Sequence, residues 1–162
     1  MKDRGLKMAK IVLLALPVLM FWMILRGNAG EVDFSLLRED VEQAVGLTGM
    51  KQGDARLLRR FYGLNGEELE NWTLWTAEDN MAVEELLLAE CETEEQAEQV
   101  RQAAEARVET QKKNFEGYGP EQVQLLDDSV IRTKGTCVLF VVSAQARQAE
   151  DAFEKAFAFR RF

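Results

Sequence analysis

The sequence contains no histidine among its 162 residues, and only two cysteines and two prolines. The absence of histidine excludes triads and metal sites that depend on an imidazole, and it removes the commonest general base. Glycine-rich phosphate loops, the GxSxG motif, the HExxH motif and a calcium-binding loop are also absent. We therefore expect a protein that is not an enzyme, with no catalytic residue, no cofactor and no metal.

The two cysteines are Cys91 and Cys137, and each lies in an apolar run of strand-like composition. An oxidising environment would allow a single disulfide between them. Their apolar surroundings favour the other interpretation, in which both are small buried hydrophobic residues. Neither has a CxxC partner, so a metal-binding or thiol-catalytic role is not expected.

Positive charge is scarce and unevenly placed. The chain has 20 basic and 28 acidic residues, a formal net charge of −8. Lys2, Arg4, Lys7, Lys10 and Arg26 all lie in the first 26 residues, so residues 27–162 carry 15 basic and 27 acidic residues, a net charge of −12. Such a surface repels phosphate backbones and excludes nucleic acid as a partner. It suits a domain beside an anionic cell envelope, or a partner with a basic patch.

One long hydrophobic run, Ile11 to Leu25, contains no charged residue. Extended back through Met8, it reaches the length of a membrane-spanning helix, because Lys10 can extend its ammonium toward the headgroups. The basic residues before it place the N-terminus in the cytoplasm. We therefore expect four parts: a basic flank with a signal-anchor helix at 1–26, a linker at 27–33, an extracytoplasmic α+β domain at 34–158, and a tail at 159–162.

The expected location is the cell membrane, with a single crossing and the C-terminal domain outside. The small residues Gly27-Asn28-Ala29 also fit a signal-peptidase site, so secretion after cleavage near Ala29 is the alternative. The bulky Phe21-Trp22-Met23 run and Arg26 precede that site and favour a retained anchor.

Hydrophobic periodicity and capping residues predict an α+β domain after the linker. Ser35, Asp54 and Thr93 each precede an amphipathic stretch as an N-cap, and Thr93 forms a capping box with Gln96. The expected helices are 35–46, 54–62, 93–115, 120–127 and 145–157, and the expected strands are 72–76, 83–91, 129–133 and 137–143. This order favours a mostly antiparallel four-stranded sheet with helix 93–115 across one face. The run from Cys137 is apolar on both sides, which is typical of a central strand.

The expected interaction surface consists of Arg56, Arg59, Arg60, Trp72 and Trp75. The three arginines form the one dense positive patch of the outer domain, although a solvated helix face explains them as well. Alternation places the two tryptophans on opposite faces of a strand, so we expect one in the core and the other at the surface.

The adjacent carboxylates Glu84 and Glu85 are expected to be solvated, on opposite sides of a strand. One of them turned inward would form a structural ion pair with an arginine of the 56–60 cluster. Arg107 is expected on the solvent side of helix 93–115.

Several short segments together resemble one bacterial family. They are Leu58 to Gly63, Asn80 to Leu86, Gln96-Ala97, Arg107 to Gln111, Phe115 to Tyr118, Val130-Ile131 and Lys134-Gly135. The family consists of domains of unknown function from anaerobic Gram-positive bacteria, typically behind an anchor or a lipoprotein signal. The resemblance spans residues 33–158 and implies a membrane-tethered extracytoplasmic domain, without an activity or a site. No cysteine stands directly after the hydrophobic run, since Cys91 and Cys137 lie far downstream, which favours an anchor helix over a lipoprotein.

These observations favour a membrane-tethered binding domain that recruits an envelope protein or polymer. One alternative is a structural or assembly accessory of the envelope. Another is an enzyme that acts on an envelope glycan through carboxylates alone, which requires two inward carboxylates about 5–9.5 Å apart.

Overall fold

The computed structural model describes residues 32–158 of the chain. The expected anchor at 11–25, the cleavage site near Ala29 and the tail at 159–162 lie outside the described residues. Within 32–158, no helix is both long enough and apolar enough to cross a membrane. The fold below belongs to the unit Asp33–Phe162.

Five α-helices form between residues 33 and 158: α2 (Phe34–Val45), α3 (Ala55–Tyr62), α4 (Glu94–Phe115), α5 (Pro120–Asp127) and α6 (Ala146–Ala158). A single 3₁₀ turn, Gly66–Glu68, follows α3. The expected capping by Asp54 and Thr93 is confirmed, since their side chains accept hydrogen bonds from the backbone N–H groups of Leu57 and Gln96. Both helices therefore begin where the sequence predicts.

The N-cap of α2 is Asp33 and not Ser35, which corrects the sequence-based expectation. The Asp33 carboxylate accepts hydrogen bonds from the backbone N–H groups of Ser35 and Leu36, at 2.9 and 3.3 Å. An aspartate is as good a cap as a serine, and here it precedes the serine in the chain. At the other end, Gly46 adopts a positive φ of 67° and ends the helix as expected.

The sheet has five strands and not the expected four: β1 (Met50–Gln52), β2 (Asn71–Ala77), β3 (Glu85–Glu90), β4 (Val130–Lys134) and β5 (Cys137–Val142). The order is β1-β2-β3-β5-β4, and all neighbouring strands are antiparallel. The missed strand, β1, is only three residues long and contains no β-branched or aromatic residue. Pairing with Trp75, Thr76 and Ala77 of β2 creates it, so tertiary context and not local propensity decides its structure.

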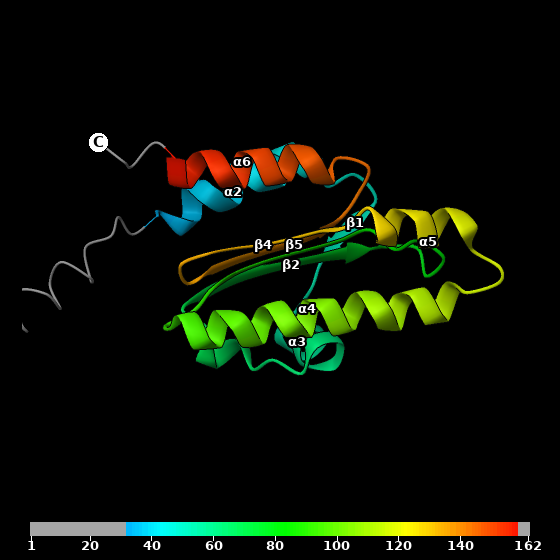
Figure 1. Ribbon diagram of the computed structural model, residues 1–162, viewed down its shortest axis with the longest axis horizontal. Coiled ribbons are helices and arrows are strands. Elements are labelled where there is room, and N and C mark those ends of the chain that lie inside the picture. Colours follow the sequence, from blue (N-terminus) through cyan, green and yellow to red (C-terminus); the bar gives the residue numbers. More distant parts are fainter. Residues whose placement is uncertain (1–31, 159–162) are drawn as a thin grey trace, which may run out of the picture. The chain divides into compact units, whose positions relative to one another are not determined.

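Helices cover both faces of the sheet (Figure 1). Helices α3 and α4 pack on one face, where Leu87 and Phe140 belong to a core that also contains Leu58 and Val100. Helices α2 and α6 pack against each other, and α6 contacts β4 and β5 from the other face. All residues of β3 and β5 are buried as a result. The expectation of a central strand covered on both sides is confirmed for β5.

Cys91 and Cys137 are both buried free thiols, which confirms the second interpretation of the cysteines. Cys91 belongs to the core under α3 and α4. Cys137 lies opposite Glu90 in the β3–β5 register, so its side chain points to the other face of the sheet. A disulfide would require both sulfurs on one face, and the fold does not place them there.

We expect both thiols to stay reduced and unreactive in the native protein. Burial raises the pKa of Cys91 to about 11 and that of Cys137 to about 12, with the nearby carboxylates of Glu70 and Glu90 adding to the effect. A thiol-specific chromogenic reagent at pH 8 should therefore label neither cysteine in the folded chain and both in urea. Because the folded chain retains protons that the unfolded chain releases, these groups should lower stability as the pH rises above about 9. Rapid native labelling would contradict this prediction.

Candidate functional site

The described residues form a polar groove of about 520 Å³. It lies between α3, α4 and the connection from β2 to β3, with the edge strand β1 at one side. Polar side chains line it: the exposed Lys51 from β1, Arg60 from α3, Asn80 from the connection and Asn114 from α4, and the half-buried Gln111 from α4. Four elements, from three separate stretches of the sequence, thus contribute to one site.

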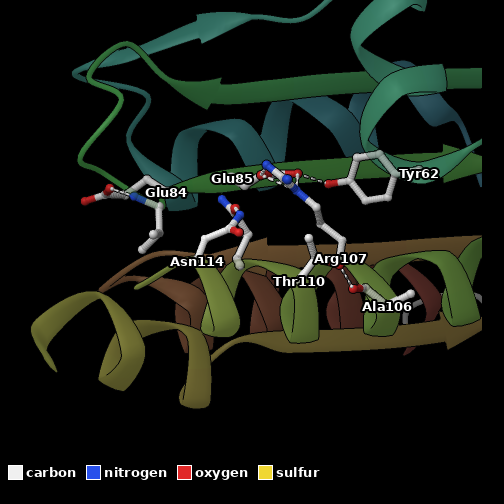
Figure 2. Close-up of polar contacts among 9 residues, drawn as sticks. Tyr62, Glu84, Glu85, Ala106, Arg107, Thr110 and Asn114 are labelled. Atoms are coloured by element: carbon white, nitrogen blue, oxygen red, sulfur yellow. Dashed lines mark hydrogen bonds and ion pairs between the residues drawn. The ribbon is translucent and has the colours of Figure 1, made fainter. Parts of the chain in front are cut away.

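A buried ion pair forms the floor of this groove. The Glu85 side chain, on β3, is only 4% exposed, and that of Arg107, on α4, is 11% exposed. Arg107 Nε lies 3.1 Å from both carboxylate oxygens of Glu85, and Nη2 lies 2.8 Å from Oε2. The Tyr62 hydroxyl donates a further short hydrogen bond to Glu85 Oε1. Figure 2 shows the carboxylate held between the arginine and the tyrosine.

Each member of the cluster depends on the others, because an unpaired buried charge is costly. The Arg107 guanidinium also lies over the Phe61 ring, 3.9 Å from its centroid. Burial raises the pKa of Tyr62 well above its usual range, and the charge and hydrogen-bond acceptance of Glu85 act in the same direction. The tyrosine is therefore a neutral donor, and Arg107 is fixed by contacts on two sides.

The structure corrects the sequence-based expectations for Glu85 and Arg107. Glu85 is buried because it pairs with Thr76 across β2 and β3 on the face that α4 covers. Its partner is Arg107 and not an arginine of the 56–60 cluster. Arg107 faces the sheet because it lies three residues after Ala104, within the same helical stripe. This three-residue spacing is the feature of the sequence that could have predicted the inward position of Arg107. Glu84 is half-buried, and its Oε2 accepts a hydrogen bond from the N–H of Val83.

The three arginines of the expected interaction surface lie on α3 but have different surroundings. Arg56 forms an ion pair with Asp54, and Arg59 donates a hydrogen bond to the Asn65 side chain. Arg60 lines the groove. Of these three arginines, only Arg60 lines the groove together with Lys51 and Arg107.

The two tryptophans occupy opposite faces of β2, as alternation predicts, and both are half-buried. Trp72 packs against the core under α3 and α4. The indole N–H of Trp75 donates a hydrogen bond of 2.9 Å to Glu42 of α2, on the other face. Their role as partner contacts remains a prediction. Sequence reasoning missed Lys51 and the groove amides, which have no motif that marks them.

The described chain is thus a three-layer α+β domain around an antiparallel sheet, with a polar groove between two helices and a strand connection. Residues 43–143 match a family described as a domain of unknown function, DUF4358. This match covers well over half of the chain, and the chain belongs to that family. Every groove residue named above lies within the matched range. No curated protein and no solved structure gives a significant match.

Proposed function

We propose that this chain is a non-enzymatic binding domain, tethered to the outer face of a bacterial membrane, that binds an envelope partner through the groove. The groove carries the proposal, because it gathers polar side chains from four elements over a rigid floor. Its volume of about 520 Å³ lies within the range of small-molecule and peptide sites.

The state of Glu85 supports a binding role over a catalytic one. Both of its oxygens accept hydrogen bonds from Arg107, and one accepts another from Tyr62. A carboxylate held in this way is a poor general base, because accepting a proton would break the ion pair. Two-carboxylate glycan hydrolysis needs a free pair of acids, and Glu85 is not available to serve in it.

The location remains a part of the proposal that rests on the uncharged run at 11–25 and the basic residues before it. We would express the full chain in a Gram-positive host and separate membranes from medium. Intact mass and N-terminal sequence should show an uncleaved product in the membrane fraction. Protease added to intact cells should digest the domain. A product that begins at Gly30 and is found in the medium would contradict the membrane tether and show that the domain is secreted.

The binding role is tested by filling the groove. Ala82 lines the groove and is half-buried. We expect Ala82→Trp, in the full chain in lipid nanodiscs, to reduce retention on purified host envelope at least tenfold. Gln102→Trp is the matched control, because Gln102 is exposed on the solvent side of α4. Circular dichroism checks that both variants fold. Equal retention of wild type and Ala82→Trp would exclude the groove as the binding site.

A further inference from the structure

Several cations of the acidic domain have no carboxylate partner, and two of them line the groove. Most arginines and lysines between residues 33 and 158 form ion pairs. Those without a described carboxylate within 4 Å are Lys51, Arg59, Arg60, Lys113 and Lys155. Lys51 and Arg60 are exposed side chains that line the same groove. The chain has an excess of acidic residues, yet this groove contains two cations that are free to form charge-assisted hydrogen bonds with a ligand carboxylate.

The floor supplies a third donor. Arg107 uses Nε and Nη2 for Glu85, whereas no described residue accepts a hydrogen bond from its Nη1. The side chain lines the groove, and no buried side-chain nitrogen or oxygen atom among the described residues lacks a hydrogen-bond partner. Nη1 is therefore not fully buried, and it belongs to a side chain that lines the groove. Glu85 and Phe61 already fix the guanidinium. Binding a ligand there therefore costs little further conformational entropy of the Arg107 side chain.

The acids of the groove limit how much negative charge a ligand can carry. Asp79 and Glu84, from the β2–β3 connection, also line it. Each accepts a hydrogen bond from a backbone N–H of the same connection, that of Met81 and that of Val83. A polyanion would approach these carboxylates, and like charges repel. A single carboxylate directed toward β1 and α3 avoids them.

The remaining groove side chains favour a peptide over a sugar. Asn80, Gln111 and Asn114 offer both donors and acceptors, which match the N–H and C=O groups of a peptide backbone. Sugar sites commonly stack a ring on an aromatic face. Phe61 is the aromatic residue of this groove, and the Arg107 guanidinium covers one face of its ring.

We infer that the groove binds a peptide segment bearing one carboxylate, held by Lys51, Arg60 and Arg107 Nη1, with the three amides on the peptide backbone. This inference rests on the proposed binding function and names its ligand class. The carboxylate is that of an acidic side chain or of a free C-terminus.

The test uses N-acetylated tetrapeptides and the full chain in phosphatidylcholine nanodiscs, with affinity measured by ligand-observed NMR titration. One probe is acetyl-Ala-Glu-Ala-Ala-amide, and its neutral control carries Gln in place of Glu. A third probe, acetyl-tetra-alanine with a free C-terminus, separates the two carboxylate sources. We expect at least one carboxylate probe to bind about tenfold more tightly than the neutral control.

Charge-removing variants locate the site. Arg60→Gln and Lys51→Gln should each lower the affinity for the preferred carboxylate probe about three- to tenfold and leave the affinity for the neutral probe unchanged. Lys113→Gln removes the same charge from an exposed position on α4 that does not line the groove, and it should change neither affinity. An equal loss in Lys113→Gln would overturn the assignment in favour of non-specific attraction.

Other results would overturn the ligand class while leaving the proposed function intact. Equal affinities for all three tetrapeptides would show that a ligand carboxylate does not contribute to binding. Tighter binding of polyglutamate or of inorganic phosphate would contradict the single carboxylate, and tighter binding of a uronic-acid trisaccharide would contradict the peptide. In each case, loss of envelope retention by Ala82→Trp would still identify the groove as a binding site.

Discussion

Replacing Arg107 by alanine is expected to lower the free energy of unfolding by about 3–5 kcal/mol, the range for a buried charge that loses its partner. The substitution leaves Glu85 beneath α4 with one remaining donor, the Tyr62 hydroxyl. It also removes the guanidinium from the Phe61 ring. Urea unfolding of the full chain in mild detergent, followed by circular dichroism, measures the change.

Arg101→Ala is the matched control on the same helix. Arg101 forms ion pairs with Glu98 and Glu105, but its side chain is 32% exposed. Solvent screens such pairs, so the expected loss is below about 1 kcal/mol. A double variant, Glu85→Leu with Arg107→Met, should recover most of the stability lost in Arg107→Ala, because it removes the unpaired charge. Equal losses of unfolding free energy for Arg107→Ala and Arg101→Ala would show that the buried ion pair matters no more for stability than an exposed one.

Replacing Phe153 by alanine is expected to cost about 3–5 kcal/mol of unfolding free energy, as found when a buried phenylalanine leaves a cavity. Phe153 is fully buried where α6 packs on the sheet. Its ring also lies 5.0 Å from that of Phe157, centroid to centroid. The loss should loosen α6 together with α2, since these helices pack on each other. The same urea titration measures it.

Phe157→Ala provides the comparison, because it removes the same atoms from the next turn of the helix. Phe157 is half-buried, so less apolar surface returns to water and the cavity is smaller. Its expected cost is less than half that of Phe153→Ala. If the two variants unfolded at the same urea concentration, α6 would not be anchored through Phe153.

Much of the fold could be predicted from the sequence, because local chemistry decides it. The capping box at Thr93 and Gln96 marks the start of α4, and Pro120 marks the start of α5. The uniformly apolar β5 indicates a strand covered on both faces. Strand β1 could not be predicted, because Met50 to Gln52 have weak strand preference and become a strand only beside β2.

The site was less predictable, because it depends on contacts between distant segments. Arg60 stood out as part of a charge cluster. Lys51 is a single lysine in the three-residue strand β1, and no local pattern connects it with Asn114 on α4. Glu85 and Arg107 had a signal in strand alternation and helix spacing, but a charged residue at a core position is normally counted as exposed. Only the packing of α4 on β3 shows that the two charges compensate each other.

The strand order has a consequence for how the domain assembles. Strand β5 lies between β3 and β4, so β3 has no partner on one edge until nearly all of the sequence is in place. Glu90 and Cys137 are partners in register, although α4, α5 and β4 separate them along the chain. Pairing over such a separation is slow, and the unpaired backbone N–H and C=O groups at this edge of β3 are open to other chains during that delay. The assembling domain is therefore most exposed to aggregation before β5 inserts, and a chain that ends before Cys137 would expose that edge permanently.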